Sequence, residues 1–108
     1  MAVKQLVRGI MEKRTPHTRL HIVQGLVVEG KVKATASALN GADDLELTFD
    51  DMCQVILQLR STDFFKSMTT YLDHTVWQDV YRPKLKCGDV YMKLTVSKGV
   101  LIVSFKEK

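Results

Sequence analysis

Apolar residues in the first half of the chain recur at the three- to four-residue spacing that is typical of an amphipathic helix. The clearest stripe consists of Leu20, Ile22, Val23, Leu26 and Val27. Thr15 and Pro16 precede it, and a capping hydroxyl followed by proline is a common helix start. Gly30 follows it, and glycine is common just past a helix C-terminus. We therefore expect a first helix from Pro16 to about Gly30.

Two further helices are predicted between residues 36 and 59. The shorter one covers Ala36 to Asn40 and ends near Gly41. Thr48 begins the longer one, because Asp51 three positions later completes a variant of the capping box. The apolar face of this helix consists of Met52, Val55, Ile56 and Leu59.

The segment 61–66 separates this helical half from the rest of the chain. Ser61-Thr62-Asp63 has the composition of another helix cap. We expect it to open a short helical turn through Phe64, Phe65 and Lys66. After this turn the hydrophobic pattern changes to a period of two, which is typical of strands.

The C-terminal segments 89–96 and 100–105 alternate in this way and flank Ser97-Lys98-Gly99. If Lys98-Gly99 is a two-residue hairpin loop, the numbers of facing residues add up to 197. One face then pairs Met92 with Phe105, Leu94 with Val103, and Val96 with Leu101. The other face pairs Tyr91 with Lys106, Lys93 with Ser104, and Thr95 with Ile102. A shift by one residue would mix apolar and polar side chains on both faces.

The same argument extends to the strand before this hairpin. A loop at Cys87-Gly88 would pair Leu85 with Val90, Arg82 with Lys93, and Tyr81 with Leu94. The face of Tyr91, Lys93 and Lys106 then also carries Gln78, Val80, Arg82 and Lys84. Trp77 and Tyr81 turn to the core, and Pro83 predicts a bulge or an edge position because it cannot donate a ladder hydrogen bond.

Together these patterns predict an α+β fold, with helices in the N-terminal half packed on a mostly antiparallel C-terminal sheet. The exposed face of that sheet would be a basic strip with one tyrosine and one glutamine. The chain has 108 residues, of which 45% are hydrophobic and 26% charged, as expected for one globular domain. No apolar run approaches the roughly 18 residues that span a bilayer, and no secretion signal is apparent. We expect a cytoplasmic protein with two reduced thiols, Cys53 and Cys87.

Positive charge is concentrated at the C-terminal end. Residues 82–108 contain seven Lys or Arg and two acidic residues, Asp89 and Glu107, a net charge of +5. Because the whole chain has a net charge of +4, the preceding 81 residues carry −1. This asymmetry is compatible with an anionic partner such as RNA, and also with a solvated basic surface.

Metal catalysis has little support in the sequence. His17 and His21 are four positions apart, but no carboxylate or cysteine motif accompanies them, which favours structural or surface histidines. There is no glycine-rich phosphate loop and no Gly-x-Ser-x-Gly motif. We expect no metal ion or cofactor in this chain.

A basic sheet face could instead cleave RNA without a metal. This reaction needs a group that takes the 2′-OH proton, cations for the phosphorane, and an acid for the leaving oxygen. Lowering the pKa of a tyrosine by two units from about 10 requires about 2.7 kcal/mol. Lys106 opposite Tyr91, with Lys93 diagonal to it, could supply part of this. Equally, Tyr91 could be an ordinary strand aromatic and the lysines solubilising residues.

Three strings resemble one known family: MEKRTPHTRL, DFFKSMTTYLDHTVWQDVYRPKL and VLIVSFKEK. They are similar to the motility quorum-sensing regulator toxins, and the similarity runs from Met11 to Lys108. It implies a RelE-like fold and one toxin domain over 11–108, preceded by an extension, 1–10. In that extension Val3, Leu6, Val7 and Ile10 have helical spacing.

The resemblance implies the toxin of a type II toxin–antitoxin pair. Such a toxin is a ribosome-independent mRNA interferase that cuts mRNA at short GC-containing, GCU-like sequences and thereby inhibits translation and growth. It also implies an antitoxin that binds zinc and has a helix-turn-helix DNA-binding domain. Contact of the toxin with DNA would then be indirect, through the antitoxin.

The functional positions of this family correspond here to Lys66, Gln78, Tyr91 and Lys106. Tyr91 would transfer a proton or position the 2′-OH, and Lys66 and Lys106 would stabilise the phosphorane. Gln78 would hold the phosphate or a base by hydrogen bonds. The RNA-binding candidates are Arg82, Lys84, Lys93 and, as a secondary candidate, His74. The alternatives are a non-catalytic module that binds RNA or the antitoxin, and a transcriptional regulator.

Overall fold

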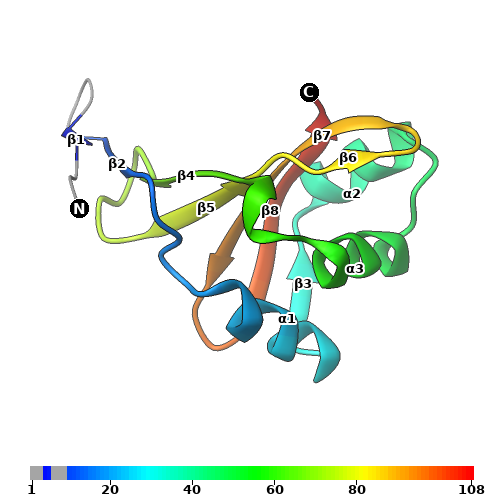
Figure 1. The fold of residues 1–108 in the computed structure, drawn as a ribbon, viewed down its shortest axis with the longest axis horizontal. Coiled ribbons are helices and arrows are strands. Elements are labelled where there is room, and N and C mark those ends of the chain that lie inside the picture. The colour runs from blue at the N-terminus through cyan, green and yellow to red at the C-terminus, as the bar shows by residue number, and fades with distance from the viewer. Residues whose placement is uncertain (1–3, 6–9) are drawn as a thin grey trace.

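Residues 4–5 and 10–108 are described by the structure, a computed structural model with three helices against a mostly antiparallel sheet (Figure 1). The helices are α1 (Leu20–Val28), α2 (Ala36–Asp44) and α3 (Phe49–Gln58), and a 3-10 turn, η2, covers Ser61–Asp63. The strands are β1 (Lys4–Gln5), β2 (Met11–Lys13), β3 (Val32–Ala34), β4 (Phe64–Thr69), β5 (Trp77–Tyr81), β6 (Lys84–Leu85), β7 (Gly88–Val96) and β8 (Val100–Glu107). The fold class is therefore α+β.

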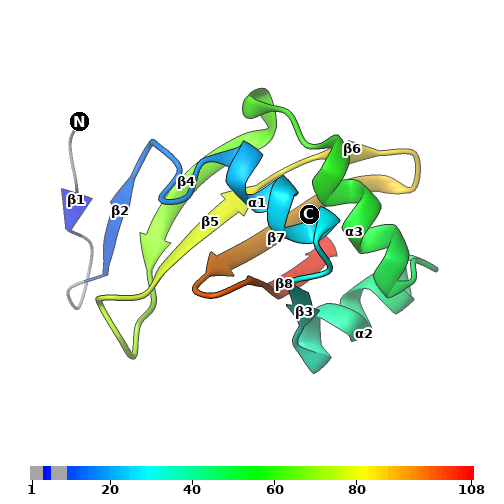
Figure 2. The ribbon, with the colours of Figure 1, turned by 90° about the horizontal axis from the view of Figure 1, so that it is seen from below.

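The sheet has the strand order β1-β2-β4-β5-β7-β8-β3, and β6 pairs with β7 beside this path. All neighbours are antiparallel except β3 and β8, which are parallel. Figure 2 shows the helices in front of one face of the sheet near β7 and β8, while β1, β2 and β4 extend beyond them. Because β1, β2 and β3 lie in the N-terminal part of the chain, the expected division into a helical half and a strand half does not hold.

The hydrophobic core lies between the helices and the strands β5, β7 and β8. Its fully buried residues include Val23 of α1, Met52 and Ile56 of α3, and Met92 and Phe105 of the sheet. Thr48 caps α3 as predicted, because its side chain accepts a hydrogen bond from Asp51 N and Asp51 caps it in return.

Helix α2 is longer than predicted, because it continues through Gly41 to Asp44. A Cβ atom at Gly41 would overlap the backbone carbonyl oxygen of Phe105 in β8. The glycine therefore does not end the helix; it allows the helix to lie directly against the strand.

Helix α1 begins later than predicted, with Arg19 rather than Thr15 at its N-cap. The backbone N–H groups of His17 and Thr18 donate to the carboxylate of Asp79 in β5, at 2.9 and 3.0 Å. These bonds hold the segment before α1 against the sheet, so a distant carboxylate overrides the local helix signal. The predicted end is correct, since Gly30 has a φ of 77° and its N–H donates to the Val27 carbonyl.

The segment 64–66 forms the start of β4 and not the helical turn that we expected. Asp63 accepts a hydrogen bond from Arg60 N at 2.8 Å, which confines the helical geometry to the short turn η2. Phe64 then pairs with Tyr81 and Lys66 with Val80, and the bulge at Phe65 accommodates the extra residue. The strand forms because β4 pairs with β2 on one side and β5 on the other.

The β7–β8 register is confirmed for half of its length. Met92 pairs with Phe105, Tyr91 with Lys106, and Lys93 with Ser104. Beyond a bulge after Lys93, Leu94 pairs with Ile102 instead of Val103, Thr95 with Leu101, and Val96 with Val100. The turn contains three residues rather than two, and the bulge compensates for the extra one. Consequently Ile102 is fully buried in the core, where we had expected it on the exposed face.

The β5–β7 register differs from the expectation by two residues. Tyr81 pairs with Met92 and Val80 with Lys93, because the β6–β7 turn is Lys86-Cys87 and Leu85 pairs with Gly88. A shift of two residues leaves every side chain on its predicted face. Tyr81 is accordingly buried in the core.

The N-terminal segment is described only in part. Lys4–Gln5 form β1, which pairs antiparallel with β2. The helical spacing of Val3, Leu6 and Val7 falls outside the described residues. Across the described ranges, no helix is long and apolar enough to cross a membrane.

Gly41→Ala should lower the free energy of unfolding by about 1 to 3 kcal/mol, because the added methyl group forces α2 away from β8. Urea unfolding measures this change. Gly25→Ala in α1 is the matched control, since nothing lies within 4 Å of its added Cβ. That variant should be at least as stable as the unmodified protein, because alanine favours a helix interior by about 1 kcal/mol. Equal stabilities for the two variants would contradict the close approach of α2 to β8.

Candidate active site on the open face of the sheet

The sheet face that points away from the helices carries most of the predicted site residues, and we call it the open face. Strand pairing places Lys66 beside Val80, Val80 beside Lys93, and Lys93 beside Ser104, in one row across four strands. Tyr91 and Lys106 form the next row. Val80 is fully buried, as expected if the long stems of the neighbouring lysines cover it.

Three lysines are close enough on this face to influence one another. The pKa of Lys93 is lowered, mainly because the amine is partly buried and further because Lys106 and Lys66 are positively charged. A folded protein gains no stability from such a concentration of like charge. An anion that binds among the three ammonium groups would reduce the repulsion between them.

Glu12 provides a counter-charge at the edge of this cluster. Its Oε2 lies 2.8 Å from Lys66 Nζ, and the residue is only 8% exposed. Glu12 belongs to β2, where the N–H of Met11 donates to Thr69 Oγ1 at 2.9 Å and fastens the strand to β4. Sequence reasoning missed Glu12, because no strand was expected before the first helix. MEK is too short to show a strand period, so the sequence held no clear signal for this strand.

Phe65 is a second residue that the sequence reasoning did not place on this face. Its ring lies 3.8 Å from the guanidinium carbon of Arg82 and makes an edge contact with the Tyr91 ring at 6.4 Å. Lys66 Nζ lies 5.2 Å from the same ring. Phe65 thus links Arg82, Tyr91 and Lys66, and the β4 bulge is the feature that turns it toward them.

Tyr91 and Lys106 lie directly opposite each other on β7 and β8. Together with Lys93, Glu107 and Lys108 they line a shallow depression of about 350 Å³. Tyr91 is half-buried and Lys106 is exposed. The neighbouring tyrosine Tyr81 is buried on the helix side, and burial together with Asp79 raises its pKa, so Tyr91 and not Tyr81 is accessible from the open face.

Gln78 is on the open face but lies farther along it. It pairs with Met68, one row beyond the Lys66–Lys93 row and on the side away from Tyr91. The fold thus brings three of the four motif residues into neighbouring rows and leaves Gln78 at one end. His74 is exposed in the loop between β4 and β5, beyond that end.

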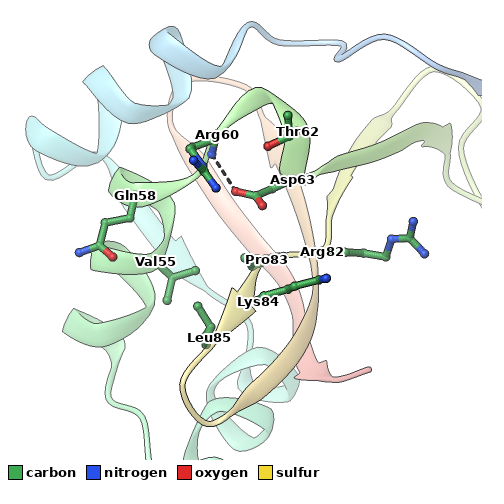
Figure 3. Close-up of a pocket in the computed structure, with 9 residues that line it drawn as sticks. All are labelled: Val55, Gln58, Arg60, Thr62, Asp63, Arg82, Pro83, Lys84 and Leu85. Atoms are coloured by element: carbon green, nitrogen blue, oxygen red, sulfur yellow. Dashed lines mark hydrogen bonds between the residues drawn. The ribbon is translucent and has the colours of Figure 1, made fainter.

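Arg82 and Lys84 lie at the opposite end of the site, near Tyr91. Arg82 is half-buried because it lies over Phe65, and Lys84 is exposed on β6. Both line a cavity between α3 and β6, and their side chains extend in the same direction (Figure 3).

The two histidines that could have shared a metal lie apart from the lysine cluster. The ring of His17 stacks on Trp77 with centroids 5.4 Å apart, and its Nδ1 is 2.9 Å from Lys13 Nζ. Burial and the charge of Lys13 lower the pKa of His17, and Asp79 opposes this. Trp77 is therefore half-buried beside His17. It does not belong to the central core, although the sequence predicted a core position for it. Within residues 4–5 and 10–108 no group of three or more His, Cys, Asp or Glu could hold a metal ion.

The fold and the open face define a class of protein: a small α+β protein with a cationic sheet face around a tyrosine, suited to the backbone of single-stranded nucleic acid. Two comparisons agree with this class. Residues 15–107 match the family model described as "Motility quorum-sensing regulator, toxin of MqsA". The chain is also 65% identical over 98 residues to "mRNA interferase toxin MqsR" of Escherichia coli (strain K12), covering 91% of this chain and all of the relative. The chain therefore belongs to the motility quorum-sensing regulator toxin family.

Lys93→Met should raise the free energy of unfolding at pH 7 by less than about 1 kcal/mol, since a half-exposed charge is screened by solvent. Its lowered pKa means that the charged form is disfavoured in the folded protein. The gain should therefore be full below the folded-state pKa and disappear as the pH rises to the unfolded value of about 10.4. Urea titrations at several pH values measure this. Lys98→Met, at an exposed turn position, should show no such pH-dependent gain.

Proposed function

We propose that this protein is an endoribonuclease that cleaves mRNA without a metal ion and without the ribosome. The main observation behind this proposal is that Lys66, Lys93 and Lys106 lie close to one another and to Tyr91 on the open face. It is supported by the family match and by the relative that is named an mRNA interferase toxin. Short GC-containing, GCU-like sequences are the proposed cleavage sites.

The proposed chemistry is an in-line attack by a ribose 2′-oxygen on the adjacent phosphorus. The 2′-oxygen loses its proton and forms a bond to phosphorus, the bond to the 5′-oxygen breaks, and that oxygen takes up a proton, so that a 2′,3′-cyclic phosphate and a 5′-hydroxyl result. Tyr91 positions the 2′-OH or takes part in its proton transfer. Lys66 and Lys106, from neighbouring rows, stabilise the negative charge that grows on the phosphorane oxygens.

The remaining residues of the open face have binding roles in this proposal. Arg82 and Lys93 contact backbone phosphates on either side of Tyr91, and Lys84 contacts the RNA beyond Arg82. Gln78 hydrogen-bonds a phosphate or a base one or two rows away from the cleaved bond. His74, exposed in the β4–β5 loop, is a peripheral contact.

Glu12 positions Lys66 in this proposal. The Glu12 carboxylate would repel a nearby RNA phosphate, so the position of Glu12 needs a compensating benefit. The 2.8 Å ion pair holds the flexible Lys66 side chain in one orientation. The pair therefore fixes the cation where the phosphorane forms, at some expense in ground-state binding.

The proposed biological setting is a type II toxin–antitoxin pair in the cytoplasm, with one RelE-like toxin domain over residues 11–108 and an N-terminal extension over 1–10. The family description names the toxin together with MqsA, which supports an antitoxin partner. We expect that partner to bind zinc, to have a helix-turn-helix DNA-binding domain, and to connect this chain to DNA only indirectly. Growth arrest would follow from loss of mRNA.

Purified protein should cut a defined RNA in the presence of EDTA. Tyr91→Phe and Lys106→Ala should each lower kcat by about 100-fold or more, because each removes a group that acts in the transition state. Lys98→Ala, remote from the open face, is the control and should cleave normally. Intact RNA with the unmodified protein would favour the alternative, a module that binds RNA or the antitoxin without cleaving. Full activity of both variants would rule out the proposed roles.

Glu12→Gln tests whether Glu12 positions Lys66. The substitution removes the ion pair and also a negative charge, so kcat should fall about tenfold, or 1.4 kcal/mol, while KM stays equal or decreases. Steady-state kinetics separate the two constants, and Glu12→Asp should restore part of kcat. An unchanged or increased kcat would show that Glu12 has no positioning role.

A further inference from the structure

Three depressions on the surface follow one another, beginning at Tyr91. The first is the depression of Tyr91 and Lys106, which ends at Lys108. Lys108 also lines a second depression of about 310 Å³, which reaches Arg82 and Lys84. These two residues in turn line a third cavity of about 440 Å³ between α3 and β6. The shared residues make the three depressions one continuous track away from the candidate active site.

The track is more basic than acidic along its whole length. Its cations are Arg60, Arg82, Lys84, Lys93, Lys106 and Lys108. Its carboxylates are Asp63, Asp89 and Glu107. Such a basic track, which starts beside a tyrosine and three lysines, has the charge distribution that a single RNA strand requires.

The third cavity differs from the rest of the track because it has an apolar wall. Figure 3 shows Val55 of α3 and Leu85 of β6 near each other at its inner side, while the amide of Gln58 points away from them. Its volume of about 440 Å³ lies within the range of small-ligand sites, which is about 300–1,000 Å³. A nucleobase has apolar faces, and such an apolar wall can accept one of them.

Charge divides the cavity into two sides. Arg82 and Lys84 extend toward the outer side, away from α3 (Figure 3). Asp63 lines both this cavity and the second depression; its Oδ2 accepts the N–H of Arg60 at 2.8 Å, and its carbonyl accepts the N–H of Arg82. A phosphate would be attracted to the outer side and repelled by Asp63, whereas a base edge with N–H donors could approach Asp63.

We propose that this cavity is a nucleotide-binding subsite for the substrate RNA, at the end of the track away from Tyr91. The phosphate of the bound nucleotide lies on Arg82 and Lys84, and its base lies against Val55 and Leu85. The proposal rests on the proposed function, since it takes RNA as the ligand. It predicts that RNA long enough to follow the track binds more tightly than RNA that covers only the face around Tyr91.

Binding of uncleavable 2′-O-methyl RNA tests the subsite independently of catalysis. A series of fluorescent oligonucleotides, extended one nucleotide at a time at either end, is titrated with the full chain. Affinity should increase stepwise on extension at one end only. Lys84→Ala should remove that increase, raising Kd about tenfold for the long RNA and little for the short one. For Lys84→Ala and the long RNA, the slope of log K against the logarithm of the salt concentration should become shallower by about 0.7. This is the change expected when one phosphate contact to a single strand is lost.

Lys86→Ala is the matched control, because Lys86 is exposed in the adjacent β6–β7 turn and lines none of the three depressions. It should bind both RNAs as the unmodified protein does, and Lys84→Arg should restore binding of the long RNA. Equal binding of short and long RNA, or equal behaviour of Lys84→Ala and Lys86→Ala, would overturn the subsite and favour a protein partner for the cavity. Length-dependent binding without cleavage of ordinary RNA would instead contradict only the proposed enzymatic activity.

Discussion

The pairing of Met92 with Phe105 is the constraint on which the site depends. Both side chains are buried against the helices, so β7 and β8 can adopt only a register that keeps them there. With this register, Tyr91 must lie opposite Lys106, and Lys93 must lie opposite Ser104, on the other face of the sheet. A slip of one residue would exchange the two faces and abolish core and site together. The hydrophobic core and the arrangement of the charges are therefore specified by the same strand pairing.

The site also shows how the fold accommodates unfavourable charge. Lys66, Lys93 and Lys106 carry like charges, and the pKa of Lys93 is lowered first by burial of its amine and further by the charges of Lys106 and Lys66. Glu12 offsets part of this positive charge through its ion pair with Lys66, but leaves the side of Tyr91 and Lys106 positive. In the proposed function the resulting field is directed at an RNA phosphate, and stability is given up locally so that the site can hold an anion. β2, which carries Glu12, is therefore part of the site although it lies toward one end of the sheet.

Several features could be predicted from local patterns. The apolar alternation of β7 and of the end of β8 from Ser104 onward predicted which side chains share a face, and the Thr48–Asp51 pair predicted the start of α3. The errors have long-range causes. Asp79 binds the N–H groups before α1 and delays that helix, and contact with Phe105 makes Gly41 a packing residue instead of a helix end. Likewise, Phe65 and Glu12 join the site through a bulge and an added strand, which no period in the sequence reveals.

The central claim is that the open face cleaves RNA through the substrate's own 2′-oxygen, with lysines in place of a metal. Its most direct test uses one RNA in two forms, unmodified and with a single 2′-deoxy nucleotide at the cleaved position, both in EDTA. The account predicts that the unmodified RNA yields a fragment ending in a 2′,3′-cyclic phosphate, whereas the deoxy form stays intact at that position. Cleavage of the deoxy form at the same bond, or a fragment with a 3′-hydroxyl end, would contradict it.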